Sequence, residues 1–428
     1  MSKRVLVYPC GTEIGLEIHK AAGNSIHFDL FGGSSSYDHG RFVYEKHIGN
    51  LHFIDDSSQK ADIERFASQI DRYDFDFIYP AMDGVLTKFS EFRECFKGQV
   101  IAPPCKTAKI TRSKKKTYGY FAGLLEVPKI IGDDTEIPFP VFVKPDVGQG
   151  ARGTALIRSE KELALYKSLN GAENLLILEY LPGEEYTIDC FTNSSGDLVY
   201  FGGRVRRRVK SGISVNAVRA ENKEFKRIAE IINANLELRG AWFFQLKENS
   251  KGQLSLLEIA PRIAGGSALT RNYGVNLPLL TLHLFDGQII DSILLNNYEL
   301  ELDRALQNSY SSTISFSRVY IDFDDTLILR GKINLQVVAF LFQCVNDGVP
   351  ITLLTRTKVD LGSSLEFYRI KGLFDDVIFV SETEKKSQYI KEQDAIFIDD
   401  SYGERAEVRR ETGINVFDTH MIECLLRH

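Results

Sequence analysis

Short apolar runs alternate with amphipathic segments along the first quarter of the chain. Strands and helices are predicted in turn at residues 5–8, 11–22, 26–30, 63–70 and 75–80. Because strands that alternate with helices form parallel sheets, this pattern predicts a Rossmann-like α/β domain over residues 1–105. Residues 81–84 follow a strand end, where open α/β sheets bind ligands. The turn at residues 9–15 lacks the glycine pattern of dinucleotide-binding folds, so no NAD site is expected.

The segment 141–154 joins an apolar strand to a glycine-rich loop. The strand ends in Lys144, and Gly148, Gly150 and Gly153 follow it. Glycines at this spacing allow backbone N–H groups to approach phosphate oxygens, and a lysine supplies a positive charge. The segment therefore predicts a clasp for a polyphosphate. A glycine-rich hairpin with a surface lysine is the alternative.

Further candidates for nucleotide binding lie on both sides of this loop. Lysines at residues 114–116 begin a predicted helix, and an apolar strand at residues 175–178 leads into Glu179 and a turn. An extended backbone beside apolar residues can read the edge of adenine, and an acid can hold ribose hydroxyls. A solvated helix face and an ordinary strand with its turn are the alternatives.

Two predicted strands, at residues 241–246 and 254–259, place Gln245 close to Glu258 if they pair. A carbonyl oxygen and a carboxylate on neighbouring strands are suitable ligands for Mg²⁺. Three cations upstream are expected on one face of a strand: Arg204, Arg206 and Arg208. Such a row suits an anionic substrate or a transferred phosphoryl group, and a solvated edge strand is the alternative.

These motifs occur in the order of the ATP-grasp superfamily, which residues 1–297 resemble. The resemblance rests on Lys114, Phe-Val-Lys-Pro with its glycine loop, Glu179-Tyr-Leu, Gln245, and Leu-Glu-Ile-Ala-Pro-Arg ending at Arg262. Several motifs in the correct order are more specific than any one of them. The chain looks most like the branch near carbamoyl phosphate synthetase and the carboxylate–amine ligases. This implies an ATP-grasp domain over residues 106–300 that uses ATP and Mg²⁺, with Mn²⁺ as an alternative.

The same resemblance implies a role for each motif residue. The phosphates would contact Lys114, Lys144, Gly148, Gly150 and Gly153. Adenine would contact Glu179 and Leu181, and ribose would contact Glu185. Gln245 and Glu258 would bind magnesium, and Arg262 would bind the acyl phosphate. Two residues depart from the family pattern, because Ser113 stands in place of an aspartate and Ala260 in place of an asparagine. The second change leaves the number of bound metals open. The implied reaction is ATP-dependent joining of a small carboxylate to an amine through an acyl phosphate.

An acidic and then serine-rich segment at residues 301–317 predicts a linker. Beyond it, three apolar strands end in polar residues: Asp322 and Asp324, Thr355, and Asp399 and Asp400. A lysine pair, Lys385 and Lys386, begins a predicted helix. Because the carboxyl ends of parallel strands meet at one edge of a sheet, these side chains are expected at one site.

That set resembles the haloacid dehalogenase-like phosphatases, whose four motifs are present over residues 318–417. The implied domain is a capless α/β domain over residues 318–428, since only 28 residues lie between Thr326 and Thr355 and 30 between Thr355 and Lys386. The implied roles are Asp322 as nucleophile and Asp324 as general acid and base. Thr355 and Lys386, rather than Lys385, would be the phosphate clamps. Asp399 or Asp400 would bind Mg²⁺ together with Asp322 and the backbone carbonyl of Asp324. The substrate would be a phosphorylated compound. A decayed, non-catalytic copy is the alternative.

Composition limits the remaining possibilities. Hydrophobic residues make up 43% and charged residues 26%, as in ordinary globular proteins, and the net charge of −6 argues against nucleic acid as partner. The absence of an apolar run of 18 residues or of a signal-peptide core predicts a cytoplasmic protein without a membrane partner, for which an oligomer is possible. The six cysteines have no metal-binding spacing.

The sequence thus predicts a multidomain α/β and α+β protein that combines a ligase with a phosphatase. The alternative is a phosphatase that a non-catalytic, ATP-sensing module regulates.

Overall fold

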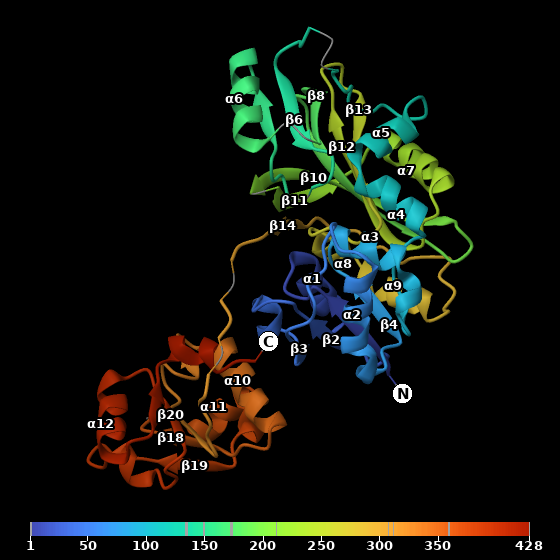
Figure 1. Cartoon of the computed structure of the whole chain (residues 1–428). Helices are drawn as coiled ribbons and strands as arrows, with labels where there is room; N and C mark the ends of the chain where they lie inside the picture. Colours follow the sequence, from blue (N-terminus) through green and yellow to red (C-terminus); the bar gives the residue numbers. More distant parts are fainter. Residues whose placement is uncertain are drawn as a thin grey trace. The chain divides into compact units, whose positions relative to one another are not determined.

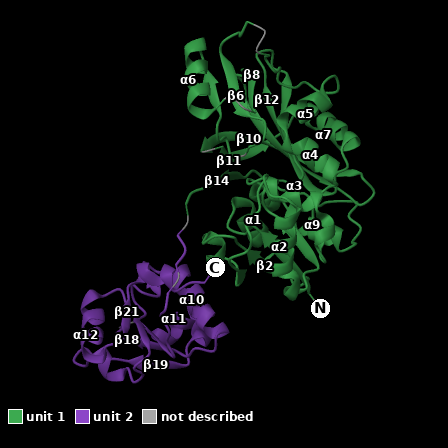
Figure 2. Cartoon of the chain, viewed as in Figure 1, with its two compact units in different colours: residues 1–306 green, residues 307–428 purple. Residues whose placement is uncertain are grey.

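The computed structural model describes residues 2–132, 136–148, 150–171, 174–210, 212–306, 308–310, 312–357 and 360–427. The chain forms two compact units, residues 1–306 and residues 307–428 (Figure 2). The division between them falls inside the segment that the sequence predicts as a linker. No helix within the described residues has both the length and the apolar character needed to cross a membrane.

The N-terminal part of unit 1 contains a five-stranded parallel sheet in the order β3-β2-β1-β4-β5. Its strands β2, β3 and β4 are labelled in Figure 1. Its elements are β1 (Lys3–Tyr8), α1 (Glu13–Ala22), β2 (Phe28–Gly33), β3 (Lys46–Ile48), α2 (Lys60–Ile70), β4 (Phe77–Pro80), α3 (Asp83–Glu91) and β5 (Gln99–Val100). Alternate residues of β1 face opposite sides, so Val5 and Val7 share a core with α1, whereas Leu6 and Tyr8 share one with α2 and α3. The parallel sheet predicted from the alternating pattern is confirmed.

Helix α9 (Leu277–Phe285) returns from the far end of unit 1 to this first sheet. Its Leu282 and Leu284 belong to the same buried core as Val5 and Val7 of β1. Because α9 covers one face of the N-terminal sheet, residues 1–306 form one compact unit rather than two separate ones.

The second sheet of unit 1 has six strands in the order β13-β12-β9-β10-β11-β14, and each neighbouring pair is antiparallel. Its strands are β9 (Glu185–Thr192), β10 (Leu198–Lys210), β11 (Ile213–Ala220), β12 (Gly240–Glu248), β13 (Leu254–Ala260) and β14 (Glu301–Asp303). Helix α7 (Lys223–Asn235) packs on this sheet through Phe225 and Ile232, which share a core with Trp242 and Phe244 of β12. Strand β14 differs from the sequence prediction, which placed residues 301–303 in the linker. Hydrogen bonding to β11 makes them part of the sheet.

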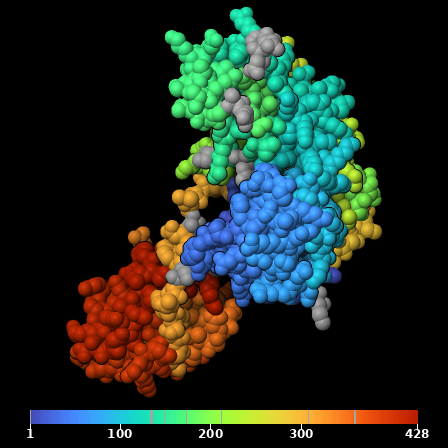
Figure 3. Space-filling view, in the orientation of Figure 1, coloured from blue at the N-terminus to red at the C-terminus, as the bar shows by residue number. Residues whose placement is uncertain are grey.

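A third, three-stranded antiparallel sheet in the order β7-β6-β8 carries the lysine of the glycine-rich segment. The remaining elements of unit 1 are α4 (Cys105–Arg112), α5 (Lys114–Phe121), β6 (Val141–Pro145), β7 (Ala155–Ile157), α6 (Glu160–Asn170), β8 (Leu175–Glu179) and α8 (Ala268–Asn272). The helix predicted to begin at residues 114–116 is present as α5. In the space-filling view, the green region around α6 and the blue N-terminal region lie toward opposite ends of unit 1 (Figure 3).

Unit 2 is built around a five-stranded parallel sheet in the order β19-β18-β15-β20-β21. Its elements are β15 (Val319–Ile321), β16 (Ile328–Leu329), β17 (Lys332–Ile333), α10 (Leu335–Asn346), β18 (Ile351–Thr355), α11 (Leu361–Phe367), β19 (Asp376–Phe379), η5 (Lys386–Tyr389), β20 (Ile396–Ile398), α12 (Tyr402–Thr412) and β21 (Asn415–Phe417). Val319 and Ile321 share a core with α10, and Tyr320 of the same strand shares one with Val408 of α12. The sheet is therefore covered on both faces.

Candidate functional site

A cavity in unit 1 lies where the beginning of α3 and the end of α4 meet strand β13. It is lined by Asp83, Leu86, Thr87, Thr111, Arg112, Lys114, Gly148, Glu258, Ile259, Ala260 and Pro261. Three of the predicted nucleotide-site residues, Lys114, Gly148 and Glu258, therefore lie around one space.

Two lysines, the buried Lys144 and the partly exposed Lys114, are cations of this region. Lys144 is 8% exposed at the end of β6, and its ammonium lies 5.3 Å from the centre of the Tyr118 ring. Burial, together with the charge of Lys114, lowers the pKa of Lys144 to about 8. Burial also lowers the pKa of Lys114, whose ammonium donates to the backbone oxygen of Asp146 at 3.2 Å. Glu258 acts on both lysines in the opposite direction. Such an arrangement is suited to an added anion, because each ammonium has given up solvation that a polyphosphate would replace.

Ser113, which departs from the family pattern, caps helix α5. Its hydroxyl oxygen accepts the Lys116 N–H at 3.1 Å and donates to the Asp146 carboxylate at 2.8 Å. The Asp146 carboxylate also accepts the Lys115 N–H at 2.7 Å. Asp146 thus supplies the acidic group at this helix terminus from the glycine-rich segment rather than from position 113.

Gln245 and Glu258 lie directly opposite each other on the antiparallel strands β12 and β13. Residues opposite each other in an antiparallel pair project to the same face, so one carbonyl oxygen and one carboxylate are offered together. This donor set fits Mg²⁺, for which oxygen ligands from one face are completed by water and phosphate. Ala260, opposite Phe243, has no ligand atom in its side chain.

Arg262 is paired with an acidic residue that the sequence did not single out. Its guanidinium donates to both carboxylate oxygens of Asp83, at 2.6 and 2.5 Å, although Asp83 lies 179 residues earlier in the chain. Burial opposes ionisation of Asp83, but the charge and hydrogen bonds of Arg262, together with the charges of Arg112 and Lys114, keep the pKa of this carboxyl below its ordinary value. The only sequence signal for Asp83 was its place just after a strand of a parallel sheet.

A cation that the sequence did not predict, Arg112, reaches the glycine-rich segment. It donates to the Gly148 carbonyl at 3.0 Å and to the Asp56 carboxylate at 2.8 and 2.5 Å. Gly150 and Gly153 have φ values of 63° and 64°, which glycine adopts without strain. Gln149, between Gly148 and Gly150, lies outside the described residues. The lysine triplet drew attention to α5, but no spacing marked Arg112 at the end of α4.

The residues predicted for adenine and ribose lie near β8 and β9. Glu179 accepts the Lys129 N–H at 2.9 Å, and Leu181 is buried. Glu185 forms an ion pair with Arg206, and its other oxygen lies 3.6 Å from the Lys247 ammonium.

The three cations predicted to share one face of β10 each form an ion pair with a carboxylate. Ion pairs join Arg204 to Asp189, Arg206 to Glu185 and Arg208 to Asp303. A shift in strand register lies between Arg206 and Arg208, and Arg204 is buried whereas Arg208 is exposed. The prediction that all three share one face is therefore wrong, because it assumed a regular strand.

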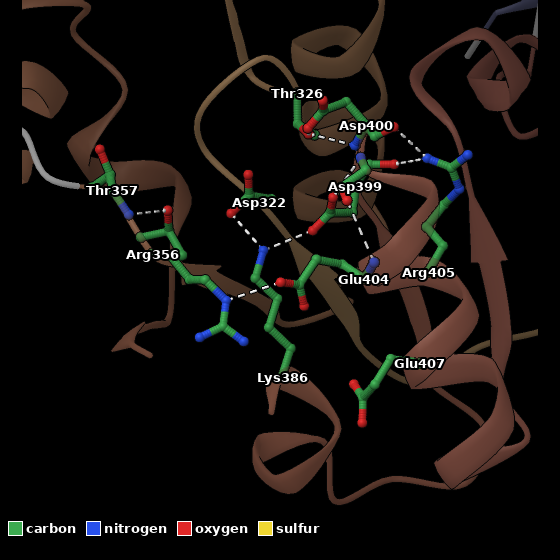
Figure 4. A network of polar contacts seen from close by, with 12 residues as sticks. Asp322, Thr326, Arg356, Thr357, Lys386, Asp399, Asp400, Glu404, Arg405 and Glu407 are labelled. Atoms are coloured by element: carbon green, nitrogen blue, oxygen red, sulfur yellow. Dashed lines mark hydrogen bonds and ion pairs between the residues drawn. The ribbon is translucent and has the colours of Figure 1, made fainter. Parts of the chain in front are cut away.

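A second group of predicted residues comes together in unit 2. Asp322, Thr355 and Asp399 follow or end the neighbouring parallel strands β15, β18 and β20, so the fold brings them to one sheet edge. Lys386, at the start of η5, donates to Asp322 and to Asp399, at 2.7 Å each (Figure 4). Lys385 instead lies at the surface beside Glu411.

The electrostatics of this cluster are set by burial. Burial raises the pKa of Asp322, and it raises the pKa of Asp399 to about 6. Although burial opposes its charge, the two carboxylates raise the pKa of Lys386 above its ordinary value. Burial makes both carboxylates costly to ionise, and a single ammonium contacts the two of them. A divalent cation at this position would be electrostatically favourable, because it would add positive charge beside these two acids.

Of the other predicted residues of unit 2, Asp400 joins this cluster. Asp322, Asp399 and Asp400 each offer a ligand atom within 4.8 Å of the others, which fits a divalent cation with oxygen ligands. Asp324 is exposed. Thr326 was not predicted as a site residue. Its hydroxyl accepts a hydrogen bond from the backbone N–H of Asp400 at 2.9 Å (Figure 4).

Comparison with known proteins identifies the fold. Residues 171–303 match the family described as ATP-grasp in the biosynthetic pathway with Ter operon. A search of curated proteins gave no match.

Solved structures similar to this chain include three enzymes. The biotin carboxylase domain of 2-oxoglutarate carboxylase from Hydrogenobacter thermophilus has 17% identity and a TM-score of 0.55, and the match covers 69% of this chain and 73% of that one. N5-carboxyaminoimidazole synthetase from Staphylococcus aureus, in complex with ADP, has 15% identity and a TM-score of 0.56, with 69% and 80% covered. L-amino acid ligase from Bacillus licheniformis has 17% identity and a TM-score of 0.52, with 67% and 74% covered. The chain therefore contains the ATP-grasp fold.

Proposed function

We propose that the chain is bifunctional. Residues 1–306 form an ADP-producing ligase that joins a small carboxylate to an amine, and residues 307–428 form a magnesium-dependent phosphatase. The ligase proposal rests above all on the opposed pair Gln245 and Glu258 beside Lys114 and the buried Lys144, within an ATP-grasp fold. A structural relative that is an L-amino acid ligase supports a carboxylate and an amine as substrates.

In the proposed ligase reaction, an oxygen of the acid attacks the γ-phosphorus of ATP, and ADP leaves. Lys114 and Lys144 neutralise the phosphate oxygens, and Arg262 holds the acyl phosphate that results. The amine nitrogen then attacks the acyl carbon, phosphate leaves, and the amine loses a proton. Magnesium held by Gln245 and Glu258 would supply further positive charge to the phosphates. No side chain of unit 1 forms a covalent bond to substrate.

The phosphatase proposal rests on the contact of Lys386 with both Asp322 and Asp399. An oxygen of Asp322 attacks the phosphorus, and Asp324 protonates the leaving alcohol. Asp324 then takes a proton from the water that hydrolyses the aspartyl-phosphate. Thr355 and Lys386 orient the phosphoryl oxygens, and Asp399 and Asp400 would hold magnesium. The short segment between β15 and α10 forms only the β16–β17 hairpin, which leaves room for large phosphate esters.

The two activities are tested separately in the full chain. For the ligase, ADP formation is measured in the Asp322→Asn variant with panels of carboxylates and amines. We expect ADP to form only when both an acid and an amine are present. ATP binding without such turnover would instead support a regulatory ATP sensor, which the missing ligand at Ala260 favours.

For the phosphatase, phosphate release from a panel of phosphate esters is measured in the Lys144→Ala variant. We expect Lys144→Ala to release phosphate at the wild-type rate. The Asp322→Asn variant should lose this activity. Release that persists in Asp322→Asn would contradict the proposed nucleophile.

A further inference from the structure

A separate cluster of polar side chains lies at the carboxyl edge of the N-terminal sheet. Cys10 follows β1, Ser34 follows β2, Asp38 lies in the next loop, and His47 is in β3. The Ser34 hydroxyl donates to Asp38 at 3.0 Å, and it lies 3.1 Å from the Cys10 sulfur and 3.1 Å from Nε2 of His47. Cys10 and Ser34 are buried, whereas Asp38 and His47 are partly exposed. Neither nucleotide chemistry nor the cavity described above uses these four residues.

We propose that Cys10, Asp38 and His47 form a binding site for Zn²⁺. One ligand atom from each residue, Sγ, a carboxylate oxygen and an imidazole nitrogen, lies within 4.8 Å of the other two. Sulfur and imidazole ligands select zinc over magnesium, which prefers oxygen. The site thus differs in chemistry from the all-oxygen sites proposed for the ATP and phosphatase reactions.

The arrangement of the donor atoms suits four-coordinate geometry. Zinc bonds of about 2.0–2.3 Å place tetrahedral ligands roughly 3.3–3.7 Å apart, so donor atoms that lie within 4.8 Å of one another need to approach by about 1.5 Å at most. The Ser34 oxygen, at 3.0–3.1 Å from all three, occupies the fourth corner of such a set. Either this hydroxyl or a water molecule completes the coordination.

Glycines at two positions allow these side chains to converge. A Cβ atom on Gly40 would lie 2.3 Å from the sulfur of Cys10, and one on Gly11 would lie 2.2 Å from the carboxylate carbon of Asp38. The Gly40 N–H also donates to the Asp38 carboxylate at 2.9 Å, which fixes the orientation of that ligand. The ion enters from the side of Asp38 and His47, and the Cys10 thiol releases its proton on binding. Bound zinc would tie together the ends of β1 and β2 and strand β3.

Cobalt(II) titration of the chelator-treated full-length protein tests this site, because cobalt replaces zinc and reports its ligands. We expect a thiolate-to-cobalt charge-transfer band in the near ultraviolet, with visible bands of tetrahedral intensity, and displacement of both by Zn²⁺. Cys10→Ser should abolish the charge-transfer band. Asp38→Asn and His47→Gln should weaken cobalt binding by about 10-fold or more. Cys95→Ser, which changes another cysteine of unit 1, serves as the matched control and should retain the band.

The result that overturns the proposal is a spectrum without thiolate charge transfer, or a band that survives Cys10→Ser. Equal cobalt affinity in wild type, Asp38→Asn and His47→Gln overturns it as well. Circular dichroism establishes that each variant is folded. Should Cys10→Ser fail to fold, the variants of the partly exposed Asp38 and His47 decide the question. As a second readout, Zn²⁺ should raise the melting temperature of wild type but not that of His47→Gln.

Discussion

Gln245 and Glu258 face each other across strands β12 and β13 in direct register. The two residues lie in separate sequence motifs, but this pairing places their side-chain oxygens on the same face of the sheet. The strand register, rather than either residue alone, therefore sets the geometry of the proposed metal site.

Changing either residue of this pair should affect magnesium use. Glu258→Gln removes the negative ligand and should lower the kcat of ATP turnover by about 10²–10³-fold. Gln245→Leu should raise the Mg²⁺ concentration needed for half-maximal turnover by about 10–100-fold. Gln253→Leu, at an exposed position in the hairpin between the same strands, is the control and should behave as wild type. An unchanged magnesium requirement in Gln245→Leu would remove this residue from the metal site.

Replacement of Lys144 should separate activity from stability. Lys144→Met should abolish ADP formation because the buried cation that faces the phosphates is lost, and phosphatase activity should stay near wild type. Because the folded-state pKa of about 8 lies below the ordinary lysine value, burial of the charged side chain costs stability at neutral pH. The variant without nucleotide should therefore be more stable by about 1–3 kcal/mol at pH 7, as measured by denaturant unfolding. The exposed Lys116 provides the control substitution, and equal loss of both activities in Lys144→Met would contradict two independent sites.

The lowered pKa of Lys144 also predicts a pH dependence of nucleotide binding. The lysine loses its charge as the pH rises through about 8, so ATP affinity should fall between pH 7 and pH 9. Lys144→Arg keeps its charge over this range, and its affinity should change much less. Titration calorimetry at several pH values measures the difference. Parallel curves for the two proteins would show that another group titrates.

Lys386 should be required for both the stability and the activity of unit 2. Its removal in Lys386→Ala leaves Asp322 and Asp399 as neighbouring buried carboxylates without their cation. We expect a loss of about 3–5 kcal/mol in the presence of a chelator, a smaller loss with Mg²⁺, and no phosphatase activity. The adjacent, exposed Lys385→Ala should change stability by about 0.5 kcal/mol or less. Thermal unfolding with and without Mg²⁺ checks this, and a loss that Mg²⁺ does not reduce would argue against a metal between these acids.

The buried pair of Arg204 and Asp189 should contribute to folding. Thr270 also donates to Asp189, at 2.6 Å, so the acid is held from two sides. Arg204→Leu leaves this buried carboxylate without its cation and should cost about 3–5 kcal/mol, whereas the double variant Arg204→Leu/Asp189→Leu should be less destabilised than either single one. Urea unfolding measures all three variants. A double variant whose loss equals the sum of the single losses would mean that the two side chains are not coupled.

Three features were predictable because each depends on the local pattern of apolar residues or on the end of a strand. They are the N-terminal parallel sheet, the pairing of β12 with β13, and the convergence of Asp322, Thr355 and Asp399. Of the two adjacent lysines, Lys386 contacts Asp322 and Asp399, although nothing in the local sequence distinguishes it from Lys385, and its role as phosphate clamp stays a prediction. Errors arose where the local rule was incomplete. An irregularity in β10 separates Arg208 from the face of Arg206, and hydrogen bonding to β11 turns residues 301–303 from linker into strand.

The sequence by itself determined the order of strands and helices, the ATP-grasp motifs and the residues at the strand ends. These follow from the periodicity of side chains and from the chemistry of short segments. Only the tertiary structure decided that Arg262 meets Asp83, 179 residues away, that α9 returns to the first sheet, and that Cys10 and His47 share one cluster. Such contacts depend on how whole sheets and helices pack, because residues distant in the chain approach only after the core has formed, and no local pattern carries that information.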